Sequence, residues 1–151
     1  MKKLMIDTGV ESFEITEGKF LRFNPADINV YNRLINAQDR IVDIERRLVE
    51  EATKIQDTTG AGEAGIKLLT EADKDMKDLL GEIFGAENDF EDIFAGVNLL
   101  SVAGNDERVI TNFLDAITPV LEEGAKRTAR KAAAQEVNRI RGNRAARRAQ
   151  K

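Results

Sequence analysis

The residues best equipped for chemistry in this chain are carboxylates, which are dense between residues 73 and 92. Paired carboxylates can act as acid and base in hydrolysis, and clustered carboxylates can bind Ca²⁺. A Ca²⁺ loop needs oxygen ligands at alternating positions, a central Gly and a terminal Glu, and neither acidic cluster has that order. Asp75 and Asp78 lie within one helical turn, as charged residues on solvated helices commonly do. An acidic surface is therefore predicted over this acidic cluster, which consists of Asp73, Asp75, Asp78, Glu82, Glu87, Asp89, Glu91 and Asp92.

The sequence contains neither Cys nor His. Their absence removes the usual ligands of zinc, the common general base near neutral pH and every Ser-His-Asp or Cys-His arrangement. The Gly-rich residues 58–65 also lack the GxxxxGK[ST] order of a phosphate-binding loop. We therefore expect no enzymatic activity, no cofactor and no metal site, and the sequence favours an interaction protein.

The stretch from Asp27 to Asp57 is the element around which the rest of the chain is organised. Two columns of apolar residues run through it with a step of seven: Leu34, Ile41, Leu48 and Ile55 form one, and Ile28, Ile35, Val42 and Val49 form the other. Because residues seven apart share nearly the same helical face, this pattern predicts one long helix. Its length of about 45 Å exceeds what a compact domain of this size usually needs. Another part of the chain or another subunit must cover it.

A small β-structure is predicted before this helix. Residues 12–16 and 19–23 alternate polar and apolar side chains around Glu17-Gly18, which is typical of a β-hairpin, and residues 1–7 are a candidate third strand. The helix start is predicted with Asn24 as its cap, Pro25 in the first turn and Asp27 near the positive helix end. The hairpin either caps the helices or offers a strand to another subunit.

The remainder of the chain predicts further helices. Residues 58–65 are expected to be a flexible connection, followed by an amphipathic helix from Ile66 to Ile83 that folds back on the long helix. A short helix capped by Asp89 follows. A last core helix is expected from an Asn105 or Asp106 cap to Leu121, with a kink or restart at Pro119 and a stop over residues 122–124. The predicted fold is a mainly α helical bundle with an N-terminal hairpin and a basic helical tail.

Charge divides the chain into an acidic body and a basic tail. Residues 125–151 contain ten Lys or Arg and only Glu136 as an acid, a net charge of +9, whereas residues 1–124 carry 13 basic and 26 acidic side chains, a net charge of −13. We therefore predict an acidic helical domain over 1–124, with its hairpin at about residues 5–23, and an Ala/Arg-rich tail over 125–151. The candidate functional residues of this basic tail are Arg139, Arg141, Arg144, Arg147 and Arg148.

Three interpretations of the tail are open. It can dock on an acidic surface, either its own or a partner's; it can bind nucleic acid; or it can be disordered. Nucleic-acid binding is disfavoured because the tail has no aromatic residue for stacking, has no recognised binding motif and follows a strongly acidic body.

The second column of the long helix is the best candidate for a binding surface. Two shorter helices can cover one column but do not suffice for both over the full length. We expect Leu34, Ile41 and Leu48 to face the intramolecular core, and Ile28, Ile35, Val42 and Val49 to face a partner. No segment reaches the roughly twenty apolar residues of a membrane span, and the N-terminus lacks the apolar run of a secretory signal, so a cytoplasmic protein is expected.

Three features together resemble the tail assembly chaperones of long-tailed, siphovirus-like bacteriophages. These are the FLRFNPADINVYNRL segment from Phe20 to Leu34, the acidic helical middle, and the NRAARRAQK ending from Asn143. The opening block, a hairpin followed by Asn24-Pro25 and a helix carrying Tyr31, is the best match and covers about the first third of the chain.

The resemblance implies a non-enzymatic protein that forms homo-oligomers, binds the tape measure protein and keeps it soluble, and helps recruit major tail protein. It also implies a host-cell cytoplasmic location and, in many members, a longer form made by ribosomal frameshifting. Two rival interpretations use the same features. One is another phage morphogenesis component, such as a scaffold or a head-tail connector; the other is a small dimeric nucleic-acid-binding regulator that uses the basic tail.

Overall fold

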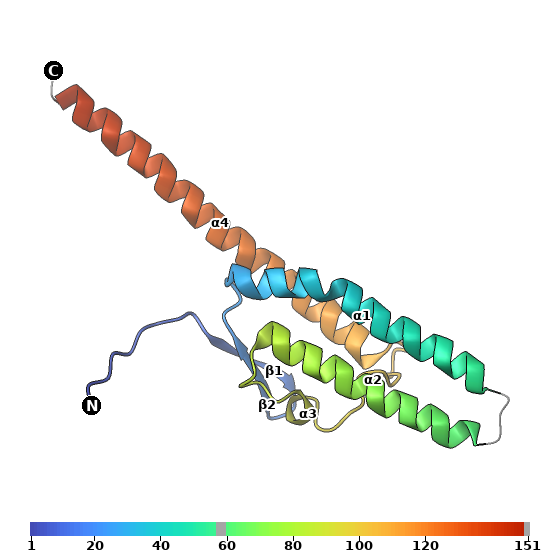
Figure 1. Ribbon diagram of the computed structural model, residues 1–151. Coiled ribbons are helices and arrows are strands. Elements are labelled where there is room, and N and C mark those ends of the chain that lie inside the picture. Colours follow the sequence, from blue (N-terminus) through green and yellow to red (C-terminus); the bar gives the residue numbers. More distant parts are fainter. Residues whose placement is uncertain (57–59, 150–151) are drawn as a thin grey trace.

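The computed structural model describes residues 1–56 and 60–149 and is mainly helical with one small sheet (Figure 1). The predicted fold class is confirmed. The elements, in chain order, are β1 (Glu11–Thr16), β2 (Lys19–Phe23), α1 (Ile28–Ile55), α2 (Ala61–Phe84), α3 (Phe90–Ile93) and α4 (Val109–Ala149).

Strands β1 and β2 form the predicted antiparallel hairpin, with Glu11 paired to Phe23 and Thr16 to Lys19. Leu21 and Phe23 are buried, while Phe20 on the opposite face is half exposed. The predicted third strand was wrong, because residues 1–10 form no strand. The Asp7 carboxylate accepts a hydrogen bond from the Gly9 N–H, and the N-terminal segment before β1 extends away from the body (Figure 1).

Helix α1 begins one turn later than predicted, with Asp27 rather than Asn24 as its cap. The Asp27 side chain accepts a hydrogen bond from the Asn29 N–H at 2.9 Å. The Asn24 side chain instead accepts from the Ala26 N–H, in a turn closed by the bond from the Asp27 N–H to the Asn24 carbonyl. Pro25 therefore lies in this turn and not in the helix. The predicted end at Asp57 lies outside the described residues.

Helix α2 runs antiparallel to α1 and beside it, so the two form a helical hairpin (Figure 1). The predicted helix from Ile66 to Ile83 is confirmed within a longer one. The predicted flexible connection was wrong from Ala61 onward, since Gly62 and Gly65 are helical, while residues 58 and 59 lie outside the described part. Each Gly costs a helix about 0.5–1 kcal/mol relative to Ala, which the packing of α2 on α1 outweighs.

The short helix α3 has the predicted cap, because the Asp89 carboxylate accepts from the Glu91 and Asp92 N–H groups. Helix α4 differs from the prediction at both ends. It begins at Val109, after Asn105 and Asp106, and continues as one helix through Pro119 and Gly124. Neither a restart at Pro119 nor a stop at residues 122–124 is present, and the boundary predicted between body and tail falls inside α4.

The core lies where the four helices and the hairpin meet. Phe84 of α2 contacts the rings of Phe23, Phe90 and Phe113, with ring centroids 5.2–6.0 Å apart, and so joins β2, α3 and α4. Asn88 fastens the hairpin to this cluster: its side chain accepts from the Arg22 N–H and donates to the Arg22 carbonyl, both at 2.9 Å. A buried amide with both its donor and acceptor satisfied fixes the position of β2.

The base of the tail is fixed to the start of α1. Gly124 is buried against the backbone of Pro25, and the Thr128 hydroxyl donates to the Ala26 carbonyl at 2.6 Å. Beyond Thr128, every described side chain of α4 is exposed, and the helix projects away from the body (Figure 1).

Candidate interaction surface

Helix α1 places its two apolar columns in different environments. Leu34, Ile41 and Leu48 are between 1% and 7% exposed, as expected for the intramolecular core. The other column remains on the surface, with exposed fractions of 38% for Ile28, 41% for Ile35, 63% for Val42 and 54% for Val49. We call these four residues the α1 strip. A row of four large aliphatic side chains exposed at steps of two helical turns along one helix is a typical site for a second helix.

Two carboxylates flank the middle of the α1 strip. Asp39 and Glu45 lie three residues before and three residues after Val42, which places one on each side of it. In the part of the chain that the structure describes, neither forms an ion pair. Several other charges on α1 are paired: Arg46 with Asp43 and Glu50, and Arg40 with Glu82 of α2 at 2.7 Å. The strip thus has an acidic rim, Asp39 and Glu45, available to a partner.

The C-terminal end of the strip opens into a groove of about 420 Å³ between α1 and α2. The groove is lined mainly by apolar atoms, and its lining residues are Leu48, Val49, Ala52, Thr53, Gln56, Gly65, Leu69 and Arg108. The Nη1 atom of Arg108 is buried and has no hydrogen-bond partner among the residues that the structure describes. Sequence reasoning missed this groove, because a single Arg before a helix carries no pattern that relates it to α1 and α2.

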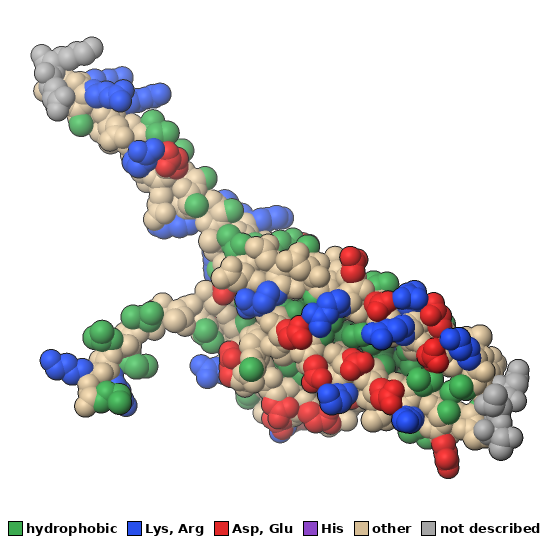
Figure 2. Space-filling model, in the orientation of Figure 1, with side chains coloured by type: hydrophobic (Ala, Val, Ile, Leu, Met, Phe, Trp, Pro, Cys, Tyr) green, Lys and Arg blue, Asp and Glu red, His purple; other side chains and the backbone are tan. Residues whose placement is uncertain are grey.

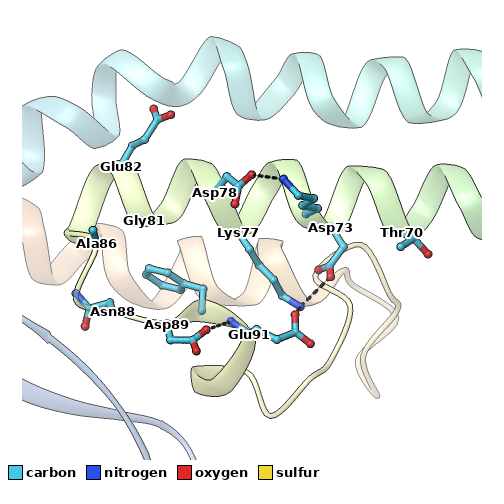
Figure 3. Close-up of a pocket in the computed structure, with 12 residues that line it drawn as sticks. Thr70, Asp73, Lys77, Asp78, Gly81, Glu82, Ala86, Asn88, Asp89 and Glu91 are labelled. Carbon is cyan, nitrogen blue, oxygen red and sulfur yellow. Dashed lines mark hydrogen bonds and ion pairs between the residues drawn. The ribbon is translucent and has the colours of Figure 1, made fainter.

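A larger hollow of about 880 Å³ lies over α2 and α3 and contains most of the acidic cluster (Figure 3). Lys77 lies in this hollow with an exposed fraction of 8%, and its ammonium group donates to Asp73 at 2.8 Å and to Glu91 at 2.6 Å. The other oxygen of Asp73 accepts from the Leu99 N–H at 2.8 Å. These groups satisfy one another and join α2 to α3 and the following loop, which is a structural role.

Charge interactions in this hollow act on the pKa of Lys77. Burial lowers the pKa of the ammonium group, but the hydrogen bonds and attraction from Asp73 and Glu91 outweigh burial, so the pKa is raised above its usual 10.5. The ammonium is therefore held in its charged form and is unsuited to act as a base near neutral pH. Within the described residues, no group of three or more acidic side chains is arranged to hold a metal ion.

The exposed part of α4 carries the basic residues predicted for the tail. Arg139 pairs with Glu136 at 2.6 Å, whereas Arg141, Arg144, Arg147 and Arg148 form no ion pair within residues 1–56 and 60–149. Figure 2 shows Lys and Arg along this projection, apart from the mixed charges of the body. The tail is helical rather than irregular, and it does not lie on the acidic body of its own chain. Of the interpretations drawn from the sequence, binding to a partner's acidic surface and binding to nucleic acid remain.

Comparison of the chain with protein-family models, curated proteins and solved structures finds no match. None of the helices in the described residues is long and apolar enough to span a membrane. The features that bear on function are thus those of the chain itself: the α1 strip, its acidic rim, the adjoining groove and the basic tail.

Proposed function

We propose that this chain is a non-enzymatic assembly chaperone that associates with itself and covers an amphipathic helix of its client. The observation that carries the proposal is the α1 strip, because Ile28, Ile35, Val42 and Val49 stay exposed on a helix whose opposite face is the core. Burial of each large aliphatic side chain contributes roughly 1.5–3 kcal/mol when it leaves water completely. Binding of a second helix along this strip would therefore have a substantially favourable free energy.

The resemblance in sequence gives the client a specific identity. Tail assembly chaperones of long-tailed bacteriophages bind the tape measure protein, a long helical polypeptide, and help recruit major tail protein in the host cytoplasm. A rod-shaped surface with spaced aliphatic contacts suits a client that presents many similar helical segments, since such contacts require apolar surface more than a fixed sequence. We assign the same activity to this chain, with Ile28, Ile35, Val42 and Val49 as its partner-binding residues.

The runner-up is a dimeric nucleic-acid-binding regulator, which the projecting basic helix favours. Phosphate contacts by Lys and Arg give a binding affinity that falls steeply with salt. The tail has no aromatic side chain to stack on bases, and the body to which it is attached has a net charge of −13 over residues 1–124. Another phage scaffold or a head-tail connector would share the α1 strip and differs from the proposal only in its client.

The decisive experiment compares the full chain with a Val42→Glu variant. Size-exclusion chromatography with light scattering across a concentration series would measure self-association, and co-expression with the tape measure protein would measure client binding. We expect oligomers and a soluble complex for the unaltered chain, and loss of both for Val42→Glu. Val102→Glu is the matched control, because Val102 is also 63% exposed but lies in the loop before α4.

Two results would contradict the proposal. One is a compact monomer at all concentrations that also fails to keep the tape measure protein soluble. The other is a Val42→Glu variant that associates and binds the client as well as Val102→Glu does. Circular dichroism of each variant should match that of the unaltered chain, because both positions are exposed.

A further inference from the structure

We infer that the basic tail of one copy docks along the α1 strip of a second copy, so that self-association is head-to-tail. The surfaces involved are the exposed end of α4, residues 129–149, and the α1 strip with its acidic rim, Asp39 and Glu45. The inference rests on the proposed function, because it gives the α1 strip an occupant within the homo-oligomer.

The tail is held where it cannot reach its own strip. Helix α4 is continuous from Val109 to Ala149, and its middle is fixed at Pro25 and Ala26 by the contacts of Gly124 and Thr128. The helix beyond this anchor points away from the body (Figure 1). A helix of 21 residues is a stiff rod, and within α4 Arg130 pairs with Glu123 and Arg139 with Glu136. The remaining Arg side chains beyond Arg139 can therefore meet an acidic surface only on another molecule.

Charge complementarity indicates that the tail binds an acidic surface of another protein molecule. Arg141, Arg144, Arg147 and Arg148 have no carboxylate partner in the described chain, and Asp39 and Glu45 on the rim have no cationic partner there. Both sets are therefore available in the isolated copy. Two copies in head-to-tail contact would pair them without breaking any ion pair that α1 already makes.

Apolar side chains on the tail match the strip. Ala133, Val137 and Ile140 recur at spacings of four and three and so share one face of α4, and Val137 and Ile140 are 46% and 41% exposed. The exposed tail is about 31 Å long, which fits within the length of about 42 Å of α1. Val137 and Ile140 can therefore lie against the strip while Arg side chains on either side reach its rim.

The apolar face of the tail formed by Ala133, Val137 and Ile140, here called the apolar seam, favours a protein over nucleic acid as the binding partner of the tail. A helix that only follows phosphates needs cations and gains nothing from exposed Val and Ile side chains. Contact with an aliphatic strip uses both the cations and the seam.

A head-to-tail contact also leaves a free strip and a free tail at the two ends of a chain of copies, so association is open-ended unless the rotation between copies closes a ring.

Reciprocal charge reversal in the full chain tests the inference. The tail variant carries Arg141→Glu, Arg144→Glu, Arg147→Glu and Arg148→Glu, and the rim variant carries Asp39→Lys and Glu45→Lys. Each variant alone would set like charges against each other, so we expect its self-association to weaken at least about tenfold in sedimentation or light scattering. An equimolar mixture restores opposite charges at both contacts, and we expect association to return. The matched control is Glu17→Lys with Glu107→Lys, two exposed acids outside α1 and α4.

The possible results are distinct. Restored association in the mixture supports the inference, as does weakening of the unaltered oligomer when salt is raised from 50 to about 500 mM. The inference is overturned if the tail variant associates like the unaltered chain, or if the two monomeric variants fail to associate when mixed. It is also overturned if duplex DNA binds the unaltered chain and not the tail variant while self-association is equal in both.

Failure of this inference can be told apart from failure of the proposed function. If the strip binds a helix but the tail is not that helix, Val42→Glu abolishes client binding whereas the tail and rim variants leave self-association unchanged. If the strip binds nothing, Val42→Glu is also without effect. The charge variants should remain folded, because every substituted side chain is exposed or half-buried and none forms an ion pair in the described chain.

Discussion

Gly124 of α4 packs directly on Pro25, so that a Cβ atom placed on Gly124 would lie 1.7 Å from the Pro25 carbonyl oxygen. No side chain fits at that distance, and the obstacle is backbone, which cannot rotate away. This contact fixes where α4 crosses the start of α1 and therefore the direction in which the basic tail leaves the body. In the sequence Gly124 resembles a helix stop, but in the structure it lies inside α4 where this helix crosses the turn before α1.

Gly124→Ala is expected to lower the free energy of unfolding by about 1–3 kcal/mol or more, because α4 or the turn before α1 must shift. Chemical denaturation followed by circular dichroism would measure the change. Gly142→Ala is the control on the same helix, since nothing lies within 4 Å of its position. That substitution should leave the global stability unchanged and increase the helical signal of the tail. Equal stability of the two variants would contradict the role assigned to Gly124.

Lys77→Met should destabilise the protein by about 1–3 kcal/mol, because it leaves the half-enclosed Asp73 without its cation and removes the link to Glu91. Lys74→Met is the comparison within α2. Its ammonium pairs with Asp78 at 2.9 Å but both side chains are largely exposed, so the expected change is within about 0.5 kcal/mol. Urea unfolding of both variants measures the difference, and similar losses would show that burial of the Lys77 pair is unimportant.

The contribution of Lys77 should also depend on pH at the alkaline end. The pKa of Lys77 in the folded protein is raised above 10.5, because burial lowers it less than the hydrogen bonds and attraction from Asp73 and Glu91 raise it. Its stabilising effect is therefore complete below pH 10.5 and is lost as the pH rises through the higher folded value. The stability difference between the unaltered chain and Lys77→Met should stay constant from pH 7 to about 10 and shrink above that. A difference that shrinks already below pH 9 would contradict the sign of the shift.

The separation of the two α1 columns was accessible from sequence because it depends on local periodicity alone. Leu34 and Val42 are both aliphatic, yet the step of seven assigns them to different faces, and their exposed fractions of 1% and 63% follow that assignment. The hairpin and the Asp89 cap were predictable for the same reason, since turn residues and capping side chains act within a few positions of themselves.

The errors arose where a distant segment determines the local structure. Local rules assign Gly124 to a helix end, but Ile117, Leu121, Gly124 and Thr128 share one helical face, and that spacing of four, three and four is a signal of continuation. Gly62 and Gly65 are helical because α2 packs on α1. Asn88 and Arg108 carry no sequence pattern at all, because the Arg22 backbone that Asn88 binds and the α1 and α2 residues around Arg108 are 39 or more residues away in the chain.

Arg108 provides a last prediction, on the groove at the end of the strip. Within residues 1–56 and 60–149 its buried Nη1 has no hydrogen-bond partner, and a buried donor without an acceptor costs about 1–3 kcal/mol. Arg108→Met keeps the aliphatic contacts with the groove and removes the unpaired nitrogen, so stability should be unchanged or should rise by about 1 kcal/mol. Arg33→Met is the contrasting control, because the Arg33 Nε donates to the Ile83 carbonyl at 2.8 Å and its loss should destabilise the α1–α2 pair. Thermal and urea unfolding would compare the two, and a loss above 1 kcal/mol for Arg108→Met would mean that the guanidinium stabilises the groove.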